Sequence, residues 1–222
     1  MRILKVYSSL LMILALAASA WAQGEIKVEP VPAPTTPDVS KALLDVLEAQ
    51  GTRVASDQGA ICEIWLRKGM TLGPPAGGLG DIMYGQLGAG NLVGVLHFSV
   101  QGADFRGNPV KPGYYALRYV LIPQDGAHVG LYPTRDALAM TPAAADTEID
   151  KTLAFADVVK LSRQVSGAPH PAFLVMSAVP DGASLPSIGK DDRGYSNLQL
   201  KLQGNNGDLP IGITVVGKWA GE

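Results

Sequence analysis

The side chains with the clearest capacity for chemistry are the three histidines, His97, His128 and His170. Their spacing matches no local metal-binding motif such as HExxH. Histidines on separate strands of a barrel can still converge on one metal ion. The sequence therefore leaves two interpretations open: a transition-metal site shared by the three, or histidines that are satisfied separately in the core or at strand edges.

A run of carboxylates suggests a second kind of metal site. Asp146, Glu148 and Asp150 stand at alternate positions, and Asp157 stands at the twelfth place counted from Asp146, as in a calcium loop. Lys151 occupies the sixth place, where such loops need a Gly for their sharp turn. An acidic, exposed approach to a helix is therefore the better interpretation, because negative charge stabilises a helix N-terminus.

Nucleophilic catalysis finds little support in the sequence. There is no G-x-S-x-G motif, and the Gly-rich segment 69–90 lacks the Lys-Ser/Thr pair of a phosphate-binding loop. Cys62, the only cysteine, alternates with Ile64 and Leu66, which predicts a buried and inert thiol. A hydrolytic or metal-dependent enzyme that uses the Gly-rich loop and the histidines is kept as the alternative function.

Tyrosines and an arginine on one predicted strand suggest a binding surface. Tyr115 and Tyr119 share one face of this strand, and Arg118 lies on the other. Tyr with Arg on an exposed sheet can bind a glycan or a protein partner, so the three residues are predicted to bind a ligand. The alternative is that the tyrosines fill the edge of the core, with their hydroxyls reaching water.

These residues belong to the most apolar hairpin of the sequence, with strands at 92–100 and 114–122. Its second half reads Gly107-Asn108-Pro109-Val110-Lys111-Pro112-Gly113-Tyr114-Tyr115-Ala116-Leu117 and closes at Ile122-Pro123. This run resembles the "G-x-x-(V/I)-x-A-G-x-Y-x-L…I-P" hairpin of a bacterial secreted domain-of-unknown-function family, with Pro112 where Ala is usual. The resemblance implies an exported β-rich domain and brings no active residues with it.

The remaining elements follow from apolar periodicity and from Gly and Pro turns. Further strands are predicted at 52–56, 60–67, 127–132, 173–179, 197–203 and 211–218. Amphipathic helices are predicted at 38–50 and at 153–165, and one helical turn is expected within 81–87. Seven or eight strands with two helices predict a mainly β (α+β) fold, either a β-sandwich or an open barrel with the helices packed on it.

The first 22 residues have the organisation of a secretory signal peptide. Arg2 and Lys5 precede an apolar run, and Ala20-Trp21-Ala22 supplies a cleavage pattern before Gln23. The run is short for a membrane span, although an uncleaved anchor is the alternative. We therefore expect export to the periplasm or beyond, with a Pro-rich spacer at 23–37 and a single domain at 38–222.

Composition narrows the class of function. A chain that is 47% hydrophobic and 17% charged is expected to be globular. A net charge of −2 without a basic stripe argues against a nucleic-acid partner. The leading prediction is a non-catalytic binding module of the periplasm or cell envelope, whose partner is a glycan, a small molecule or an envelope protein. No mature transmembrane segment is predicted, and no cofactor other than the transition metal considered above.

Overall fold

The computed structural model describes residues 25–74, 82–125, 132–166 and 168–217. Its main strands are β1 Lys27–Pro32, β2 Gln50–Ser56, β3 Gly59–Leu66, β4 Leu92–Phe98, β7 Gly113–Leu121, β8 Asp136–Pro142, β9 Phe173–Ser177, β10 Ser187–Lys190, β11 Ser196–Leu202 and β12 Leu209–Val216. They form one sheet of ten strands in the order β1-β2-β3-β4-β7-β8-β9-β12-β11-β10. Two short strands, β5 Gly102–Ala103 and β6 Pro109–Val110, pair separately.

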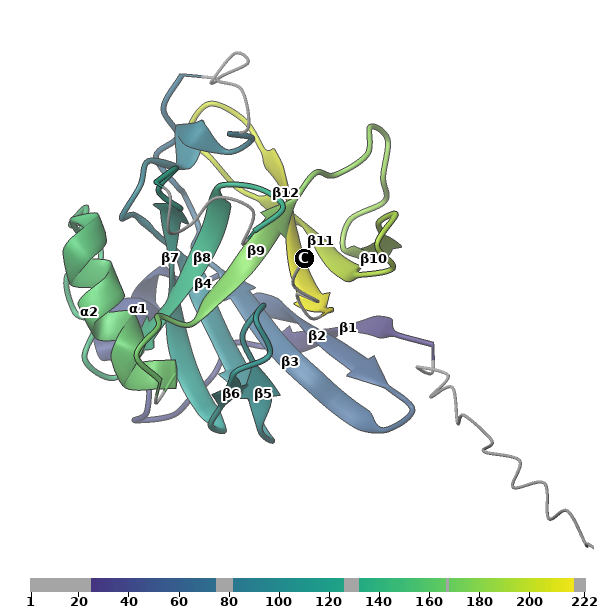
Figure 1. The fold of residues 1–222 in the computed structure, drawn as a ribbon, viewed down its shortest axis with the longest axis horizontal. Coiled ribbons are helices and arrows are strands. Elements are labelled where there is room, and N and C mark those ends of the chain that lie inside the picture. Colours follow the sequence, from purple (N-terminus) through teal and green to yellow (C-terminus); the bar gives the residue numbers. More distant parts are fainter. Residues whose placement is uncertain (1–24, 75–81, 126–131, 167, 218–222) are drawn as a thin grey trace, which may run out of the picture.

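The ten-stranded sheet curves into an almost closed barrel (Figure 1). Its two end strands, β1 and β10, contact each other without pairing, and we call the gap between them the seam. All neighbouring strands are antiparallel. The mainly β fold is thus confirmed in its open-barrel form, and the β-sandwich alternative is wrong. The count of seven or eight strands is too low.

The additional strands lie where the sequence lacks a strand pattern. β1 lies within the segment 23–37 that was predicted to be a spacer, and it contains Pro30 and Pro32. An edge strand tolerates proline because one of its sides makes no ladder hydrogen bonds. β8 is rich in alanine, which has a low strand propensity. The strand predicted at 127–132 falls almost entirely outside the described residues.

The barrel interior contains the main hydrophobic cluster. Cys62, Ile64 and Leu66 point inward from β3, as their alternation predicts. Leu198, Leu200 and Leu202 do the same from β11. The predicted hairpin became β4 and β7, which pair at the centre of the strand order. Central strands are covered on both faces, which explains why apolar residues occur on both sides of this hairpin.

The first helix, α1 Lys41–Val46, is shorter than the helix predicted at 38–50. Ser40 is its N-cap, since the Ser40 hydroxyl accepts a hydrogen bond from the Leu43 amide at 3.2 Å. The helix ends because Leu47 takes an extended conformation and the Glu48 amide donates to the Leu66 carbonyl of β3. Tertiary hydrogen bonds to a strand therefore replace the last helical turn.

The second helix, α2 Phe155–Ser166, packs on the outside of β8 (Figure 1). Ala137 and Ala139 of β8 are fully buried under it together with Val158. Small residues on the outer face of β8 let the helix approach closely, so packing explains the alanines at positions 137 and 139. A 3₁₀ turn, η1 Gly85–Leu87, confirms the helical turn predicted within 81–87. Within the described residues no helix is long and apolar enough to cross a membrane.

Candidate functional site

His97 points outward from β4 and is satisfied by its neighbours. Its Nδ1 lies 2.8 Å from Oε2 of Glu63 on β3, and its ring stacks on Tyr114 of β7 with centroids 4.1 Å apart. Glu63 also accepts from Arg53 Nε at 2.7 Å. These residues stand opposite one another in the sheet register, so they form one polar row across four adjacent strands.

The structure does not bring the described histidines together. His170 is exposed after α2, and its backbone carbonyl accepts from the Ser166 hydroxyl at 2.6 Å. His128 lies outside the described residues. Among the described side chains, no group of three His, Cys, Asp or Glu could hold a metal ion. The metal site shared by His97, His128 and His170 therefore stays a prediction.

The alternate carboxylates also do not converge. Asp146 pairs with Arg118 at 2.7 Å, and Glu148 pairs with Lys151 at 2.8 Å. Asp150 pairs with Arg67. Each acid thus faces a different basic side chain, which is not the arrangement of a calcium loop.

Tyr115, Arg118 and Tyr119 are all buried, with exposed fractions of 8%, 0% and 0%. The Tyr115 hydroxyl donates to the Lys111 carbonyl at 2.7 Å. The Tyr119 hydroxyl donates to Asp136 at 2.6 Å, and burial raises the pKa of this tyrosine. The tyrosines therefore lie in the core, as the alternative interpretation predicted, but their hydroxyls bond to protein acceptors and not to water. The predicted binding role assumed exposed side chains, whereas all three are buried.

The Cys62 thiol is expected not to react with Ellman's reagent at pH 8 while the protein is folded. Cys62 is 2% exposed, and burial raises its pKa to about 12. The thiolate is the reactive form, so the folded protein should show no labelling over a time in which the protein denatured in guanidinium labels fully. Rapid labelling of the folded protein would contradict the buried position.

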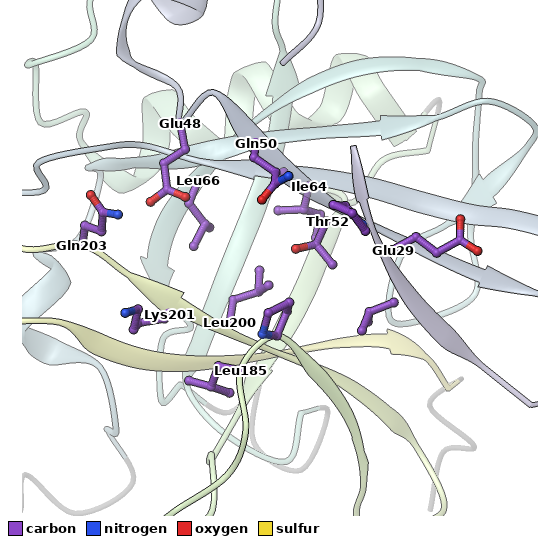
Figure 2. A pocket seen from close by; sticks show the side chains of 14 residues that line it. Glu29, Glu48, Gln50, Thr52, Ile64, Leu66, Leu185, Leu200, Lys201 and Gln203 are labelled. Atoms are coloured by element: carbon purple, nitrogen blue, oxygen red, sulfur yellow. The ribbon is translucent and has the colours of Figure 1, made fainter. Parts of the chain in front are cut away.

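A cavity of about 380 Å³ lies at the seam (Figure 2), and we call it the seam pocket. Its polar lining residues are Glu29, Glu48, Gln50, Thr52, Lys201 and Gln203. Its apolar lining residues are Val28, Pro30, Ile64, Leu66, Leu185, Pro186 and Leu200. The pocket lies between β1, β2 and β3 on one side and β11 with the segment before β10 on the other.

The seam stays open because its edge strands cannot complete a ladder. β10 pairs only with the first part of β11, from Ser196 to Gln199, although β11 continues to Leu202. Pro186, directly before β10, has no N–H to extend this pairing. On the opposite edge, two of the six residues of β1 are proline. The unpaired stretch of β11 therefore borders the pocket.

Trp65 holds the β1 side of the seam in place. Its indole Nε1 donates to the Pro32 carbonyl at 2.9 Å, which ties the end of β1 to β3 across β2. Gly51 makes room for this contact, because a Cβ at this position would lie 2.4 Å from Cδ1 of Trp65. The wall of the pocket is thus fixed by packing on the outer face of the barrel.

Glu48 is the unusual residue of the seam pocket. One of its carboxylate oxygens, Oε1, is buried without a hydrogen-bond partner among the described residues. Burial raises the pKa of Glu48, nearby Lys201 lowers it, and Asp208 raises it again. Lys201 is itself paired with Asp208 at 3.1 Å. In Figure 2 the carboxylate of Glu48 points into the pocket, between Gln203 and Gln50.

Replacing Glu48 with Gln is expected to stabilise the protein near pH 7 and to lose this effect toward pH 4. A raised pKa means that Glu48 contributes stability that is complete below its unfolded pKa and is lost as pH rises through its folded pKa. The gain should not exceed about 1 kcal/mol, because solvent screens a half-buried group. Melting temperatures of both proteins across this range test it; an equal difference at both ends would contradict it.

A second cavity of about 600 Å³ lies beside the β2–β3 turn. It is bordered by the segment from Phe98 to Phe105 and by the end of β12. Val100, one of the two exposed large apolar residues among those described, is part of its lining.

Sequence reasoning did not find the seam pocket. Glu48 fell within the predicted first helix, and Lys201 fell on the polar side of an alternating strand. Neither position belongs to a motif. The one available signal was the pair of prolines at 30 and 32, which mark an edge strand once the segment is known to join the sheet.

Comparisons with protein-family models, with curated proteins and with solved structures found no match for this chain. The resemblance of the Gly107–Pro123 hairpin to a secreted family stays a prediction. The fold defines the protein as an almost closed barrel of one ten-stranded sheet, with two helices packed outside it.

Proposed function

We propose that this protein is an exported, non-catalytic binding module that holds a small molecule in the seam pocket. The observation that carries the proposal is the buried, unpartnered Oε1 of Glu48 at the wall of a cavity of about 380 Å³. Buried polar atoms nearly always have a partner, so an orphaned carboxylate oxygen is expected where a ligand supplies one. The volume is within the range of small-molecule sites, which runs from about 300 to 1,000 Å³.

The composition of the pocket supports binding more than catalysis. Its described polar groups are carboxylates, amides, one hydroxyl and one ammonium, which orient a ligand through hydrogen bonds. A nucleophile next to a general base, the usual arrangement for covalent catalysis, does not occur among these lining residues. The signal-like N-terminus supports export, and the ligand would then be met in the periplasm or outside the cell.

Thermal denaturation with a panel of small metabolites tests the proposal. The protein should be expressed from its full-length gene and purified from the exported fraction. A ligand at about 100 times its Kd should add roughly 2.7 kcal/mol, which raises the melting temperature of a protein of this size by about 5–10 °C. Recovery of the protein only from the cytoplasm would contradict the exported part of the proposal.

Two tryptophan variants locate the ligand. Leu185→Trp adds bulk at the rim of the seam pocket and should abolish the stabilisation by the ligand. Val100→Trp places the same indole ring at the second cavity and should leave the stabilisation by the ligand unchanged. The opposite result would move the site to the second cavity, and stabilisation insensitive to Leu185→Trp would refute a ligand in the seam pocket.

A further inference from the structure

We propose that the ligand of the seam pocket is an amine: a small molecule that carries a protonated amino group with free N–H on an apolar body. This inference rests on the proposed function of the pocket and names the chemical class that the pocket would take. Its basis is the charge of the pocket, the missing hydrogen-bond donor at Glu48, and the division of the lining into polar and apolar parts.

The charge balance of the pocket favours a cation. Glu48 is the carboxylate that points into the pocket, whereas the carboxylate of Glu29 points away from it in Figure 2, from a position opposite Arg53 in the sheet register. The described lining has one cation, Lys201. Lys201 is shared with Asp208 outside the lining, where the two charges are 3.1 Å apart. Two acids, Glu48 and Asp208, and one base, Lys201, give this part of the pocket a formal charge of −1, which an incoming ammonium would neutralise.

The hydrogen-bonding need of the pocket is for donors. Oε1 of Glu48 is a buried acceptor without a partner, and the donor that suits it best is a charged N–H. An ammonium group carries such donors and no acceptor. Figure 2 shows Gln50 and Gln203 on either side of Glu48, and their amide oxygens are the natural acceptors for the remaining N–H groups.

The lining of the seam pocket favours an ammonium group with N–H over a quaternary ammonium group. Quaternary ammonium groups have no N–H and are recognised by aromatic faces. None of the described residues that line the seam pocket is aromatic. The carboxylate is therefore the receptor, and it selects an ammonium that can donate a hydrogen bond over a quaternary one.

The opposite part of the pocket suits an apolar body. Leu66, Leu200 and Leu185 lie below Glu48 in Figure 2, and Ile64 lies to the right of Leu66, beside Thr52. Leu200 and Ile64 belong to the interior cluster of the barrel, so the apolar end of the pocket is continuous with the core. A ligand with its amine at Glu48 would bury its hydrocarbon part against these side chains.

Four probes with the same six-carbon chain test the inference by isothermal titration at pH 7 and low salt: hexylamine, hexyltrimethylammonium, hexanol and hexanoate. Hexylamine is expected to bind with a Kd of about 1 mM, a reasonable value for so small a ligand. The other three should bind at least about tenfold more weakly, because each lacks either the positive charge or the charged N–H donor.

Variants assign the effect to Glu48. Glu48→Gln should weaken hexylamine about 10- to 100-fold, the size of one charge-assisted hydrogen bond. Asp45→Asn removes a charge from exposed α1 outside the pocket and should change nothing. Lys201→Met should tighten hexylamine and weaken hexanoate, a change of opposite sign that a loss of folding cannot produce.

The outcomes separate this inference from the proposed function. Hexanol, hexanoate or hexyltrimethylammonium could bind as tightly as hexylamine or more tightly, and lose this binding in Leu185→Trp. That result would overturn the inference of an amine ligand and would support a small-molecule site in the seam pocket. Hexylamine binding that survives Glu48→Gln would also overturn the amine. If neither the hexyl probes nor any ligand of the wider panel responds to Leu185→Trp, both proposals fail.

Discussion

Replacing Arg118 with Met is expected to lower the melting temperature by roughly 6–20 °C, which corresponds to about 3–5 kcal/mol for a chain of this size. Arg118 is completely buried on the outer face of β7. Its Nε and Nη2 donate to the two carboxylate oxygens of Asp146 at 2.8 and 2.7 Å. Its remaining bonds go to backbone carbonyls, those of Gly90, Glu148 and Lys151.

The cost arises mainly because Met would leave the buried carboxylate of Asp146 without Arg118. Three carbonyls would also lose one hydrogen bond each, although those of Gly90 and Glu148 keep a backbone amide donor. Arg118 thus fixes the segment before α2 against the barrel. The sequence had predicted instead that Arg118 is an exposed residue that binds a ligand. Scanning calorimetry of the variant measures the loss.

A double variant and a matched arginine provide the controls. Arg118→Met with Asp146→Ala should recover part of the loss, because no buried charge is then left unpaired. Arg67→Met breaks a pair whose acid, Asp150, is 87% exposed, and it should cost only about 1 kcal/mol. A melting temperature of Arg118→Met within about 3 °C of the original protein would show that the buried pair is not needed.

Replacing Asp136 with Ala is the second change with a large expected effect, again about 3–5 kcal/mol. Asp136 is completely buried at the start of β8. It accepts hydrogen bonds from the amides of Met83 and Tyr84 at 2.8 and 2.9 Å and from the Tyr119 hydroxyl at 2.6 Å. Alanine would remove the acceptor of three donors, of which the Tyr84 amide and the Tyr119 hydroxyl are buried and the Met83 amide is part-buried.

The segment around η1 should detach from the barrel in this variant. Tyr84 also donates to the Ser177 carbonyl at 2.6 Å and accepts from the Gly212 amide at 3.2 Å, so the loss would reach β9 and β12. Hydrogen exchange of the Met83 and Tyr84 amides reports this directly. Unchanged protection of both amides would contradict the anchoring role.

Tyr119→Phe is the matched control for Asp136. It removes one donor and leaves the two amide bonds to Asp136 in place. Its cost should be near 1 kcal/mol, or about 2–4 °C. If Tyr119→Phe lost as much stability as Asp136→Ala, the Tyr119 hydroxyl, and not the two amides of the η1 segment, would be the main partner that stabilises Asp136.

The sequence by itself determined the strands whose apolar residues alternate or run continuously. The inward face of β11, with Leu198, Leu200 and Leu202, follows from a period of two residues. The hairpin of β4 and β7 follows from two long apolar runs bounded by Gly and Pro. Each of these signals is local, because side-chain period and turn chemistry depend on neighbouring residues alone.

The sequence could not supply the elements that depend on partners distant along the chain. β8 is a strand because β7, β9 and α2 surround it, which overrides the low strand propensity of its alanines. The first helix ends early because Glu48 hydrogen-bonds to β3. From the sequence, Arg118 is predicted to lie at the surface, because its partner Asp146 is 28 residues away and no local pattern connects the two.

The candidate site belongs entirely to this second category. The seam pocket exists because β1 and β10, the two ends of the strand order, meet without pairing. No local pattern marks Glu48, because its buried oxygen results from the approach of β11 and of the segment before β10. Local patterns in the sequence therefore predict many of the strands, whereas the pocket results from the closure of the barrel, which depends on contacts between β1 and β10, far apart in the sequence.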